Sequence, residues 1–390
     1  MGTNDKRLLF LTERFSPDLG GVSKSATRIA HAIDALGMTV DVLALTKAIQ
    51  AGSLETDSFG RNSHIHRLGM FSNIDYSLQH ASNVMDWLAD CSGGYDAVWG
   101  HYLFPAGFLG VMTARRFNCK SVVSARGNDV DRLIFPPGDF ARLKWTLENA
   151  DVVTSVSTDL ASKIQGLLGG TDPHVIYNVV DEQIFHADDQ HDRAAELKSE
   201  LGISSNDLVL GFCGELRHKK GLPFLLSAIR ELSETRNVKL LVIGDLRPRA
   251  QAALNAFGAD YPQAHSNIVV TGELESAYEI ARHLRLSDVF LLPSVWEGLP
   301  NALLEAMAAG IPCLASTAGG ITDVIQHEEN GFLLPIHQLH RLSTAIEEIL
   351  SLPEDRLNSI VESARMTVSE KFSPSNEQQR LSELFEKLWA

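Results

Sequence analysis

Several features that are scarce or missing in this sequence exclude whole classes of protein. The four cysteines, Cys91, Cys119, Cys213 and Cys313, are scattered over 390 residues, without the close spacing of a zinc site or a disulfide framework. We therefore expect a reducing, cytoplasmic compartment. No apolar run approaches the roughly 20 residues of a membrane-spanning helix, and the run from Leu8 to Leu11 is too short for a signal sequence. Peripheral contact with the inner face of a membrane stays open.

Positive charge and two cofactor motifs are also scarce. The 34 Lys and Arg residues face 49 Asp and Glu residues, for a formal net charge of −15. That balance disfavours nucleic acid as a partner, and also a broad footprint on anionic membranes. No GxGxxG fingerprint is present, which makes a dinucleotide-dependent oxidoreductase the least favoured enzyme class. No Asp-x-Asp segment directly follows a predicted strand, and we expect neither a metal nor another cofactor.

What is present is a repeated alternation of short apolar runs with longer helical patterns. This alternation indicates parallel sheets covered by helices, and 390 residues suit two domains better than one. We predict an N-terminal Rossmann-like domain over 1–183 and a C-terminal Rossmann-like domain over 184–372, with an amphipathic helix over 373–390 packing back on the first domain. The expected strands are Arg7–Thr12, Thr39–Leu45, Ala97–Trp99, Ser121–Ser124, Val152–Val156 and His174–Ile176, then Leu208–Cys213, Lys239–Ile243, Ile268–Val270, Val289–Leu292 and Pro312–Ala315. Because open α/β sheets bind ligands beyond the carboxyl ends of their strands, we expect a site in a cleft between the two domains.

The most informative segment runs from Ser294 to Gly310, directly after a predicted strand. Pro300 suits the first position of a helix and Gly310 the position just past its end. The free amides at such a helix start, over 301–303, suit a diphosphate. Glu297 before the helix and Glu305 inside it can reach different parts of one ligand, a sugar and a ribose diol, although both could instead be solvated surface residues.

Two other loops after predicted strands suit phosphate or sugar binding. Gly20 and Gly21 allow close approach of the backbone to a ligand, but a Gly-Gly pair is also an ordinary loop. The segment from Cys213 to Gly221 contains Arg217, His218, Lys219 and Lys220, which could neutralise a diphosphate. A charged surface loop is the commoner explanation of such a segment taken by itself.

In the first half, His101, Arg126 and Asp129 follow candidate strands and are plausible residues of the cleft, with Arg126 and Asp129 as the acceptor-side candidates. A lone histidine is more often structural than functional. Asp129 or Asp131 could act as a base, while Asn-Asp is also common turn chemistry. The loop 132–137 could touch an apolar or lipid-linked acceptor or pack against its own domain, and packing is slightly favoured.

With these segments in place, the sequence resembles the retaining GT-B glycosyltransferases of family 4 over nearly its whole length. The most specific match is Glu297 to Glu305, with seven residues between the two acids, inside PSVWEGLPNALLEAMAAGIPCLAS. The Gly20-Gly21 loop, GHYLFPAG, the Asn178-Val-Val-Asp181 stretch and Gly319-Gly320 followed by NGFLLP are also similar. The family is associated with polysaccharide biosynthesis.

The resemblance implies roles for particular residues. Glu305 would hold the ribose hydroxyls, Glu297 would contact the donor sugar near the reacting carbon, and Lys220 would bind phosphate. The implied catalytic residues are Glu297, Lys220 and His101, and the implied donor-binding residues are Gly20, Gly21, Arg217, Lys220, Gly298, Leu299, Asn301, Ala302, Leu303 and Glu305. Two positions depart from the family pattern: Glu215 stands where an arginine is usual, so that Arg217 or Lys219 would have to supply the charge, and Arg126 stands where a histidine is frequent.

These observations together predict a glycosyltransferase that moves a hexose-type sugar from a nucleotide diphosphate sugar, with UDP- or GDP-sugars favoured, to a saccharide, lipid-linked or small-molecule acceptor. The resemblance implies that the anomeric configuration is retained. A nucleotide-sugar-binding protein without transferase activity, suggested by Glu215, is the alternative, as is an epimerase or phosphorylase on the same scaffold.

Overall fold

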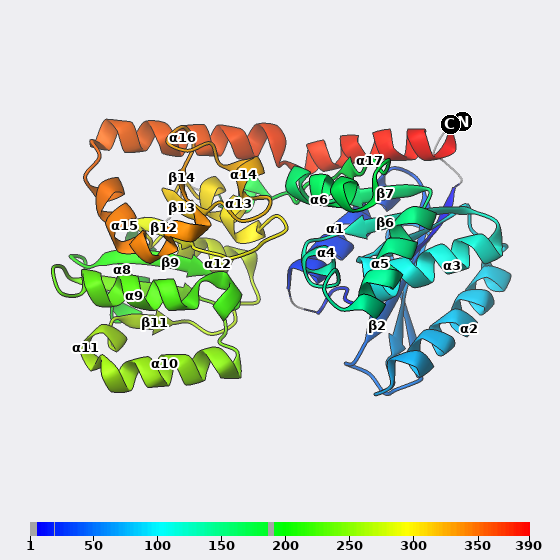
Figure 1. The fold of residues 1–390 in the computed structure, drawn as a ribbon, viewed down its shortest axis with the longest axis horizontal. Helices are drawn as coiled ribbons and strands as arrows, with labels where there is room; N and C mark the ends of the chain where they lie inside the picture. Colours follow the sequence, from blue (N-terminus) through cyan, green and yellow to red (C-terminus); the bar gives the residue numbers. More distant parts are fainter. Residues whose placement is uncertain (1–5, 19, 186–190) are drawn as a thin grey trace. The chain divides into compact units, whose positions relative to one another are not determined.

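The computed structural model describes residues 6–18, 20–185 and 191–390. The first five residues of the opening segment, Leu19 of the glycine loop and residues 186–190 of the polar stretch lie outside the described residues. The chain divides into two compact units (Figure 1). Unit 1 contains Met1–Asn178 and Ser375–Ala390, and unit 2 contains Val179–Pro374. The first division therefore falls between 178 and 179, five residues before the position expected from the sequence.

Within the described residues, unit 1 is built on an eight-stranded sheet in the order β3-β4-β2-β1-β5-β6-β7-β8. Its described strand pairs are parallel, apart from the antiparallel hairpin of β3 and β4. The parallel strands are short and largely buried, as expected when helices cover both faces of a sheet. The strands are β1 Arg7–Thr12, β2 Thr39–Thr46, β3 Leu54–Phe59, β4 Ser63–Gly69, β5 Ala97–His101, β6 Lys120–Ala125, β7 Val152–Ser155 and β8 His174–Val175.

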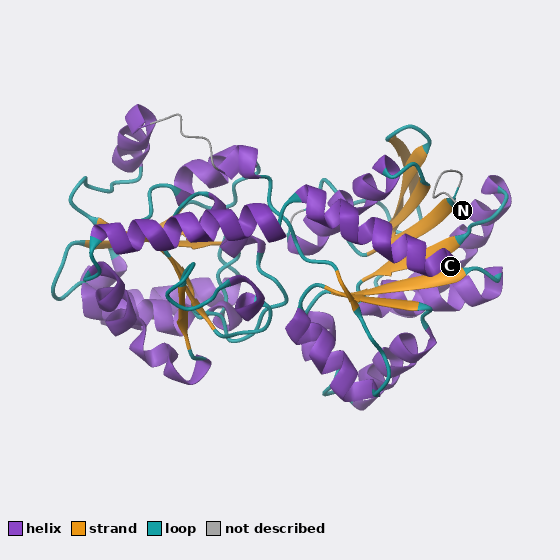
Figure 2. Ribbon diagram, turned by 90° about the horizontal axis from the view of Figure 1, so that it is seen from above, coloured by secondary structure: helices purple, strands orange, loops and turns teal. Residues whose placement is uncertain are grey.

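The residues of β1 alternate between two hydrophobic cores, one on each face of the sheet. Leu8 and Phe10 belong to the core built with α1 (Gly21–Ala35) and α17 (Pro374–Trp389), whereas Leu9 and Leu11 belong to the core built with α2 (Ile74–Ser92) and α3 (Phe108–Phe117). Figure 2 shows helices on both sides of this sheet. The helical segments of unit 1 are α1 Gly21–Ala35, α2 Ile74–Ser92, η1 Leu103–Gly107, α3 Phe108–Phe117, α4 Asn128–Asp131, α5 Pro137–Asn149, α6 Thr158–Leu168 and α17 Pro374–Trp389.

Unit 2 contains, in its described part, a six-stranded sheet of parallel strands in the order β11-β10-β9-β12-β13-β14. Its strands are β9 Leu208–Cys213, β10 Val238–Ile243, β11 Ile268–Val270, β12 Val289–Leu292, β13 Cys313–Ser316 and β14 Phe332–Leu334. Its helical segments are α7 Glu182–Phe185, α8 His191–Glu200, η2 His218–Lys220, α9 Leu222–Leu232, α10 Pro248–Asp260, α11 Pro262–His265, α12 Ala277–Leu284, α13 Asn301–Ala308, α14 Ile321–Val324, η3 Ile336–Arg341, α15 Leu342–Leu350 and α16 Glu354–Lys371.

The strand orders fix where each unit can bind a ligand. In unit 1 the order reverses between β1 and β5, and in unit 2 it reverses between β9 and β12. At such a switch point, the loops after the two strands leave in opposite directions and open a crevice at the carboxyl edge of the sheet. The Gly20-Gly21 loop, the segment from Cys213 to Gly221 and the segment from Ser294 to Gly310 follow three of these four strands, and His101 ends the fourth, whereas Arg126 and Asp129 follow β6 beside β5. Both units therefore have the architecture of a doubly wound α/β fold.

Candidate functional site

A buried ion pair between Lys220 and Glu297 lies at the switch point of unit 2. The Lys220 Nζ donates to Glu297 Oε1 at 2.5 Å, and Ser294 Oγ donates to the same oxygen at 2.7 Å. The two charged side chains are only 17% and 7% exposed. Burial by itself would raise the pKa of Glu297, but the charges of Lys220 and Lys219 and the two hydrogen bonds hold that pKa below its usual value. Glu297 is therefore ionised at neutral pH.

The backbone around this pair depends on two glycines. Gly221 has φ +86°, and a Cβ there would lie 2.1 Å from the carbonyl oxygen of Pro293. Gly319 has φ +54°, and a Cβ there would lie 1.9 Å from the carbonyl oxygen of Glu297. Larger residues would collide at either position, so the glycines allow the loops after β9, β12 and β13 to meet around Glu297.

Backbone hydrogen bonds tie these same loops together. Val295 N donates to Lys219 O at 2.8 Å, which joins the loops after β12 and β9. Gly320 N donates to Gly298 O at 2.8 Å, which joins the loops after β13 and β12. The bond at Gly298 lies directly beside Glu297 in the chain. Local backbone structure therefore holds the Glu297 carboxylate in place.

The helix expected after Glu297 is α13, and it begins one residue later than predicted. Pro300 is the residue that caps the helix, with extended backbone, rather than its first residue, and it provides no side-chain hydrogen bond to that end. Gly310 lies past the other end with φ +75°, as expected. The amides of Asn301 and Ala302 thus lie at the positive end of the helix dipole.

Several predicted donor-binding residues gather on α13 and the turn before it. Glu305 is 7% exposed, Leu299 5% and Leu303 fully buried. The Asn301 side-chain oxygen is buried and has no hydrogen-bond partner among the residues that the structure describes. A buried polar atom in that state is costly unless a ligand or water satisfies it. The unpartnered side-chain oxygen of Asn301 is therefore consistent with a polar ligand at this end of the helix.

Unit 1 places His101 at the last position of β5, where it is fully buried. Its Nε2 lies 2.9 Å from Ser25 Oγ, and its ring stacks on Phe10 with the ring centres 5.5 Å apart. Burial, and then the charges of Arg126 and Arg28, lower the pKa of His101 well below its usual value. The imidazole is therefore neutral at physiological pH. Its Nδ1 has no hydrogen-bond partner within the described part of the chain.

The glycine loop and the loop after β6 lie at the same edge of this sheet. Gly20 caps α1 with φ +111°, and Gly21 is the first residue of that helix. Asp129 is 1% exposed and accepts hydrogen bonds from the backbone N–H groups of Arg126, Gly127 and Leu103 at 2.8–3.2 Å. Burial raises the pKa of Asp129 to about 6, against these donors. Asp129 therefore holds the backbone of this loop in its conformation.

The other acidic and basic candidates of unit 1 have protein partners. Arg126 donates to Asn178 Oδ1 at 2.5 Å, and burial lowers its pKa to about 10. Asp131 forms an ion pair with Lys163 at 3.0 Å, which favours a structural role over that of a base. In the loop 132–137, Leu133 is buried but Phe135 is 77% exposed. That loop thus both packs on its domain and presents an apolar side chain.

Glu13 is a candidate that the sequence reasoning missed. It follows β1 directly, at the switch point of unit 1. Burial raises its pKa to about 7; the charge of Arg14 opposes this rise and that of Asp129 adds to it. Tyr102, which has φ +95°, also interacts electrostatically with Glu13 and Asp129. The signal was available, since an acid directly after the first core strand must lie at the binding edge.

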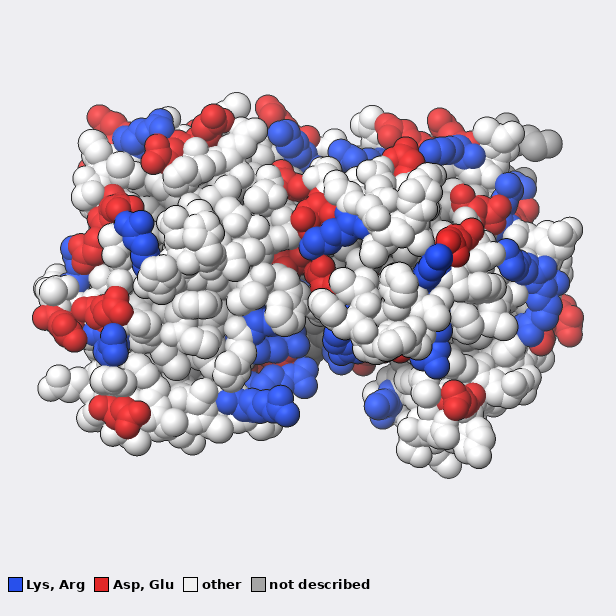
Figure 3. Space-filling view, in the orientation of Figure 1, with Lys and Arg blue, Asp and Glu red and all other residues white. Residues whose placement is uncertain are grey.

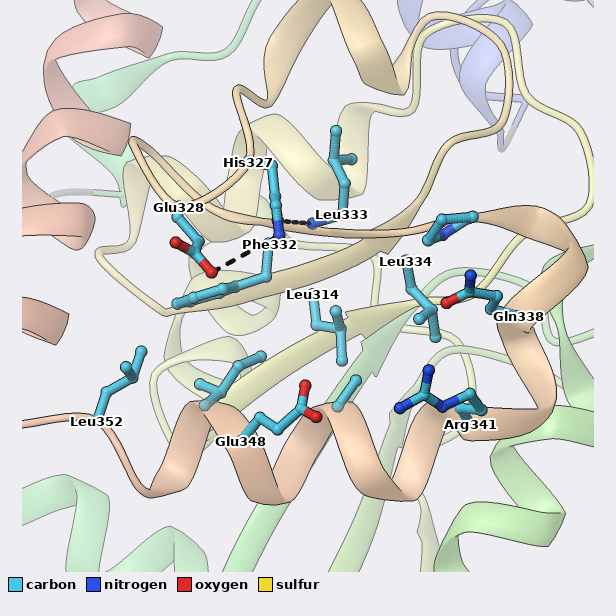
Figure 4. Close-up of a pocket in the computed structure, with 13 residues that line it drawn as sticks. Leu314, His327, Glu328, Phe332, Leu333, Leu334, Gln338, Arg341, Glu348 and Leu352 are labelled. Atoms are coloured by element: carbon cyan, nitrogen blue, oxygen red, sulfur yellow. Dashed lines mark hydrogen bonds and ion pairs between the residues drawn. The ribbon is translucent and has the colours of Figure 1, made fainter.

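A separate pocket of about 240 Å³ lies elsewhere in unit 2. It is formed by β13, β14, η3 and α15, and Figure 4 shows His327 bonded to the backbone of Leu333 beside it. Arg341 and Glu348 also line this pocket, but none of the predicted site residues does.

Among the described residues, no group of three or more His, Cys, Asp or Glu side chains could hold a metal ion. No helix in the described ranges is long and apolar enough to cross a membrane.

Known proteins resemble both halves of the chain. The family described as Glycosyltransferase Family 4 matches residues 19–184, and the family described as Glycosyl transferases group 1 matches residues 207–352. N-acetyl-alpha-D-glucosaminyl L-malate synthase from Bacillus anthracis is 24% identical over 359 residues, 91% of each chain.

Solved structures extend the likeness to the whole fold. Sucrose-phosphate synthase from Thermosynechococcus elongatus aligns with a TM-score of 0.83 at 18% identity, over 98% of this chain and 99% of that one. HepE from Anabaena, solved in complex with UDP and glucose, aligns with a TM-score of 0.77 at 18% identity, over 98% of this chain and 100% of that one. Each of the two units is an α/β domain with mostly parallel strands, and each contains a family match. The chain therefore belongs to the family 4 glycosyltransferases of the GT-B fold.

Proposed function

We propose that this glycosyltransferase moves a hexose-type sugar from a UDP- or GDP-sugar to an acceptor hydroxyl, with retention of the anomeric configuration and without a metal ion. The observation that carries the proposal is the buried Lys220–Glu297 pair beside the start of α13, at the switch point of unit 2. Such a site offers a cation and free backbone amides to a diphosphate and a fixed carboxylate to a sugar. HepE, a structural relative, binds UDP and glucose.

Departure of the diphosphate is the demanding step of this reaction. The bond between the anomeric carbon and the diphosphate oxygen breaks, the electron pair stays on the diphosphate, and positive charge develops on the sugar ring. Lys220 and the amides of Asn301 and Ala302 stabilise the growing negative charge. Glu297, held ionised by Lys220, stabilises the positive ring. Glu305, one turn into α13, accepts hydrogen bonds from the ribose hydroxyls.

The acceptor completes the reaction on the face that the diphosphate leaves. Its oxygen bonds to the anomeric carbon, and its proton passes to an oxygen of the departing diphosphate. This route gives retention without a covalent enzyme intermediate, so that Glu297 acts as an electrostatic stabiliser. The acceptor is a saccharide, a lipid-linked molecule or a small molecule, and we place its binding site in unit 1. Arg126, Asp129 and His101 lie there at the carboxyl edge of the sheet. We propose His101 as a neutral hydrogen-bonding residue there, because its pKa is lowered.

A binding and turnover panel tests the proposal. Calorimetry with UDP, GDP and ADP and their common sugar conjugates, in the presence of EDTA, should show selective binding of one nucleotide. Glu305→Ala should weaken that binding about 10-fold or more, since charge-assisted hydrogen bonds to the ribose are lost. Glu297→Ala should lower turnover more than donor affinity, and NMR of the product should show the anomeric configuration of the donor.

Glu347→Ala is the matched control, because Glu347 is an exposed glutamate of unit 2 on α15, in an ion pair with Arg236. It should leave binding and turnover unchanged. Unchanged kinetics in both Glu297→Ala and Glu305→Ala would overturn the site, and a strict metal requirement would overturn the metal-free mechanism. Donor binding without hydrolysis or transfer to any acceptor would favour the alternative, a nucleotide-sugar-binding protein.

A further inference from the structure

Glu215 lies between two arginines in unit 2. Its Oε2 is 3.0 Å from Arg217 Nε, and its Oε1 accepts a hydrogen bond from Arg247 Nε. Arg217 follows β9 and Arg247 follows β10, so the two cations reach one carboxylate from neighbouring loops. A negative residue next to a phosphate-binding loop is unexpected by simple electrostatics. Its contacts with Arg217 and Arg247 give a physical reason for a carboxylate at this position.

The backbone holds the two loops side by side. Gly214 N donates to Ile243 O at 2.8 Å, and Leu216 N donates to Asp245 O at 3.1 Å. Gly244 has φ +141°, and a Cβ there would lie 2.5 Å from the Gly214 carbonyl oxygen. Since the Leu216 side chain is also buried, the loops cannot separate without disturbing the core. The distance between the two arginine backbones is therefore set by the fold.

The cluster of Arg217, Glu215 and Arg247 keeps a net positive charge and unused donors. One carboxylate neutralises only one of the two guanidinium groups. Within the described residues, hydrogen bonds and ion pairs engage only the Nε atom of each arginine, which leaves the Nη atoms available. The three side chains are 30–57% exposed, and ion pairs this exposed contribute little to stability. Stability therefore gives no sufficient reason for the arrangement.

The position of this cluster connects it to the donor site. Arg217 directly precedes η2, which carries Lys220, and both follow β9 at the switch point. Figure 3 shows a dense group of Lys and Arg side chains near the lower edge of unit 2, drawn on the left. Planar guanidinium groups bind phosphate oxygens in pairs of hydrogen bonds, which an ammonium group cannot do.

We propose that Glu215 is a positioning residue that orients Arg217 and Arg247, and that the Nη atoms of these two arginines bind the diphosphate of the donor. This inference rests on the proposed function and adds Arg247 and Glu215 to its site. The cluster performs with two oriented arginines the charge neutralisation that a single arginine at position 215 would perform. Glu215 itself does not touch the donor.

Glu215→Gln gives a test in which the two explanations differ in sign. If Glu215 only repels the diphosphate, removing its charge should tighten nucleotide binding. If it orients the arginines, binding of UDP or GDP should weaken about 3- to 10-fold, because a charge-assisted contact is lost. Arg247→Ala should weaken binding about 10-fold or more, and Arg247→Lys should recover little of it, since the bidentate geometry is gone.

The measurement is calorimetry on the full chain with UDP, GDP, inorganic pyrophosphate and the phosphate-free nucleosides. The losses should appear with the diphosphates and be absent with the nucleosides. The double variant Glu215→Gln/Arg247→Ala should bind more weakly than Arg247→Ala alone, because Arg217 also loses its orienting carboxylate. The combined loss should be smaller than the sum of the two single losses, because residues that act together are not additive. Arg236→Ala is the matched control: it removes an exposed arginine paired with a glutamate, but at the amino end of β10.

The outcomes separate this inference from the proposed function. Tighter binding in Glu215→Gln, or unchanged diphosphate binding in Arg247→Ala while the wild type binds UDP or GDP, would overturn the inference and leave the donor site standing. Pyrophosphate binding that depends on Arg247, in a protein that binds no nucleotide, would support the arginine site and overturn the proposed function. No binding of any phosphate by the wild type would overturn both.

Discussion

Replacing Lys220 by alanine should destabilise unit 2 by an amount that depends on pH. The change leaves the Glu297 carboxylate, 7% exposed, without its main counter-charge. Removing one partner of a fully buried ion pair costs about 3–5 kcal/mol. Lys220 is 17% exposed, and Ser294 and Lys219 still favour the ionised carboxylate. We therefore expect a loss of about 2–4 kcal/mol at neutral pH.

The sign of the pH dependence follows from the pKa of Glu297. In the wild type this pKa lies below its usual value of 4.5, so that the pair stabilises the fold above pH 4.5 and loses its effect as the pH falls through the folded pKa. In Lys220→Ala, burial dominates and raises the pKa, so stability falls as the pH rises. The deficit of the variant should thus grow between about pH 5 and about pH 8, by up to about 1.4 kcal/mol per pH unit.

Hydrogen exchange followed by mass spectrometry suits this measurement, because peptides from β12 and α13 report the opening of unit 2 alone. The variant Lys220→Met/Glu297→Gln serves as the control, since it removes both charges at similar volume and should cost much less than Lys220→Ala with little dependence on pH. A loss of unfolding free energy below about 0.5 kcal/mol at neutral pH, or a loss that is the same at about pH 5 and about pH 8, would refute the reasoning.

Two other substitutions test the remaining environments. Burial raises the pKa of Glu13 from 4.5 to about 7, so the ionisation of Glu13 opposes folding as the pH rises through that range. Glu13→Gln should therefore stabilise unit 1 by on the order of 3 kcal/mol at pH 8 and hardly at pH 4. Equal effects at these two pH values in urea unfolding would contradict this prediction. Gly319→Ala should destabilise unit 2 by about 2 kcal/mol or more and lower turnover, because its Cβ would lie 1.9 Å from the Glu297 carbonyl oxygen at φ +54°; wild-type melting and kinetics would show that the loop relaxes freely.

Much of the sheet architecture could be predicted from the sequence, because buried parallel strands are short runs of apolar residues. The predicted strands Arg7–Thr12, Leu208–Cys213, Ile268–Val270 and Val289–Leu292 agree with β1, β9, β11 and β12 residue for residue. Three of the strands in the described residues were not predicted. β3, LETDSF, is a largely exposed and polar edge strand. Its partner β4, SHIHRLG, has two histidines and an arginine among its few apolar residues, and β14 has only three residues. Pairing with a neighbour, rather than local pattern, makes these segments strands.

The part of the candidate site that could be predicted consists of residues that directly follow predicted strands. The sequence placed Lys220 and Glu297 after two core strands, and their ion pair follows from β9 and β12 being neighbours in the sheet. The contact between Glu215 and Arg247 was not predictable, because the residues are 32 positions apart and their loops meet only through the order of the strands. The burial of individual side chains could not be predicted from the sequence either. The position of Glu13 directly after a strand was therefore the only indication of its raised pKa. The donor-binding and catalytic roles themselves stay predictions.

The contribution of α17 to unit 1 has a consequence for the order in which the protein folds during synthesis. Leu381, Leu384 and Phe385 lie in the same core as Leu8 and Phe10, at the other end of the chain. Domains fold as units while the chain emerges from the ribosome. Unit 2 is one continuous segment and has all of its residues before α17 is made, whereas unit 1 begins first and is completed last. Until residues 375–390 are made, part of the apolar face formed by β1 and α1 stays uncovered, and exposed apolar surface of this kind makes a nascent chain prone to aggregation.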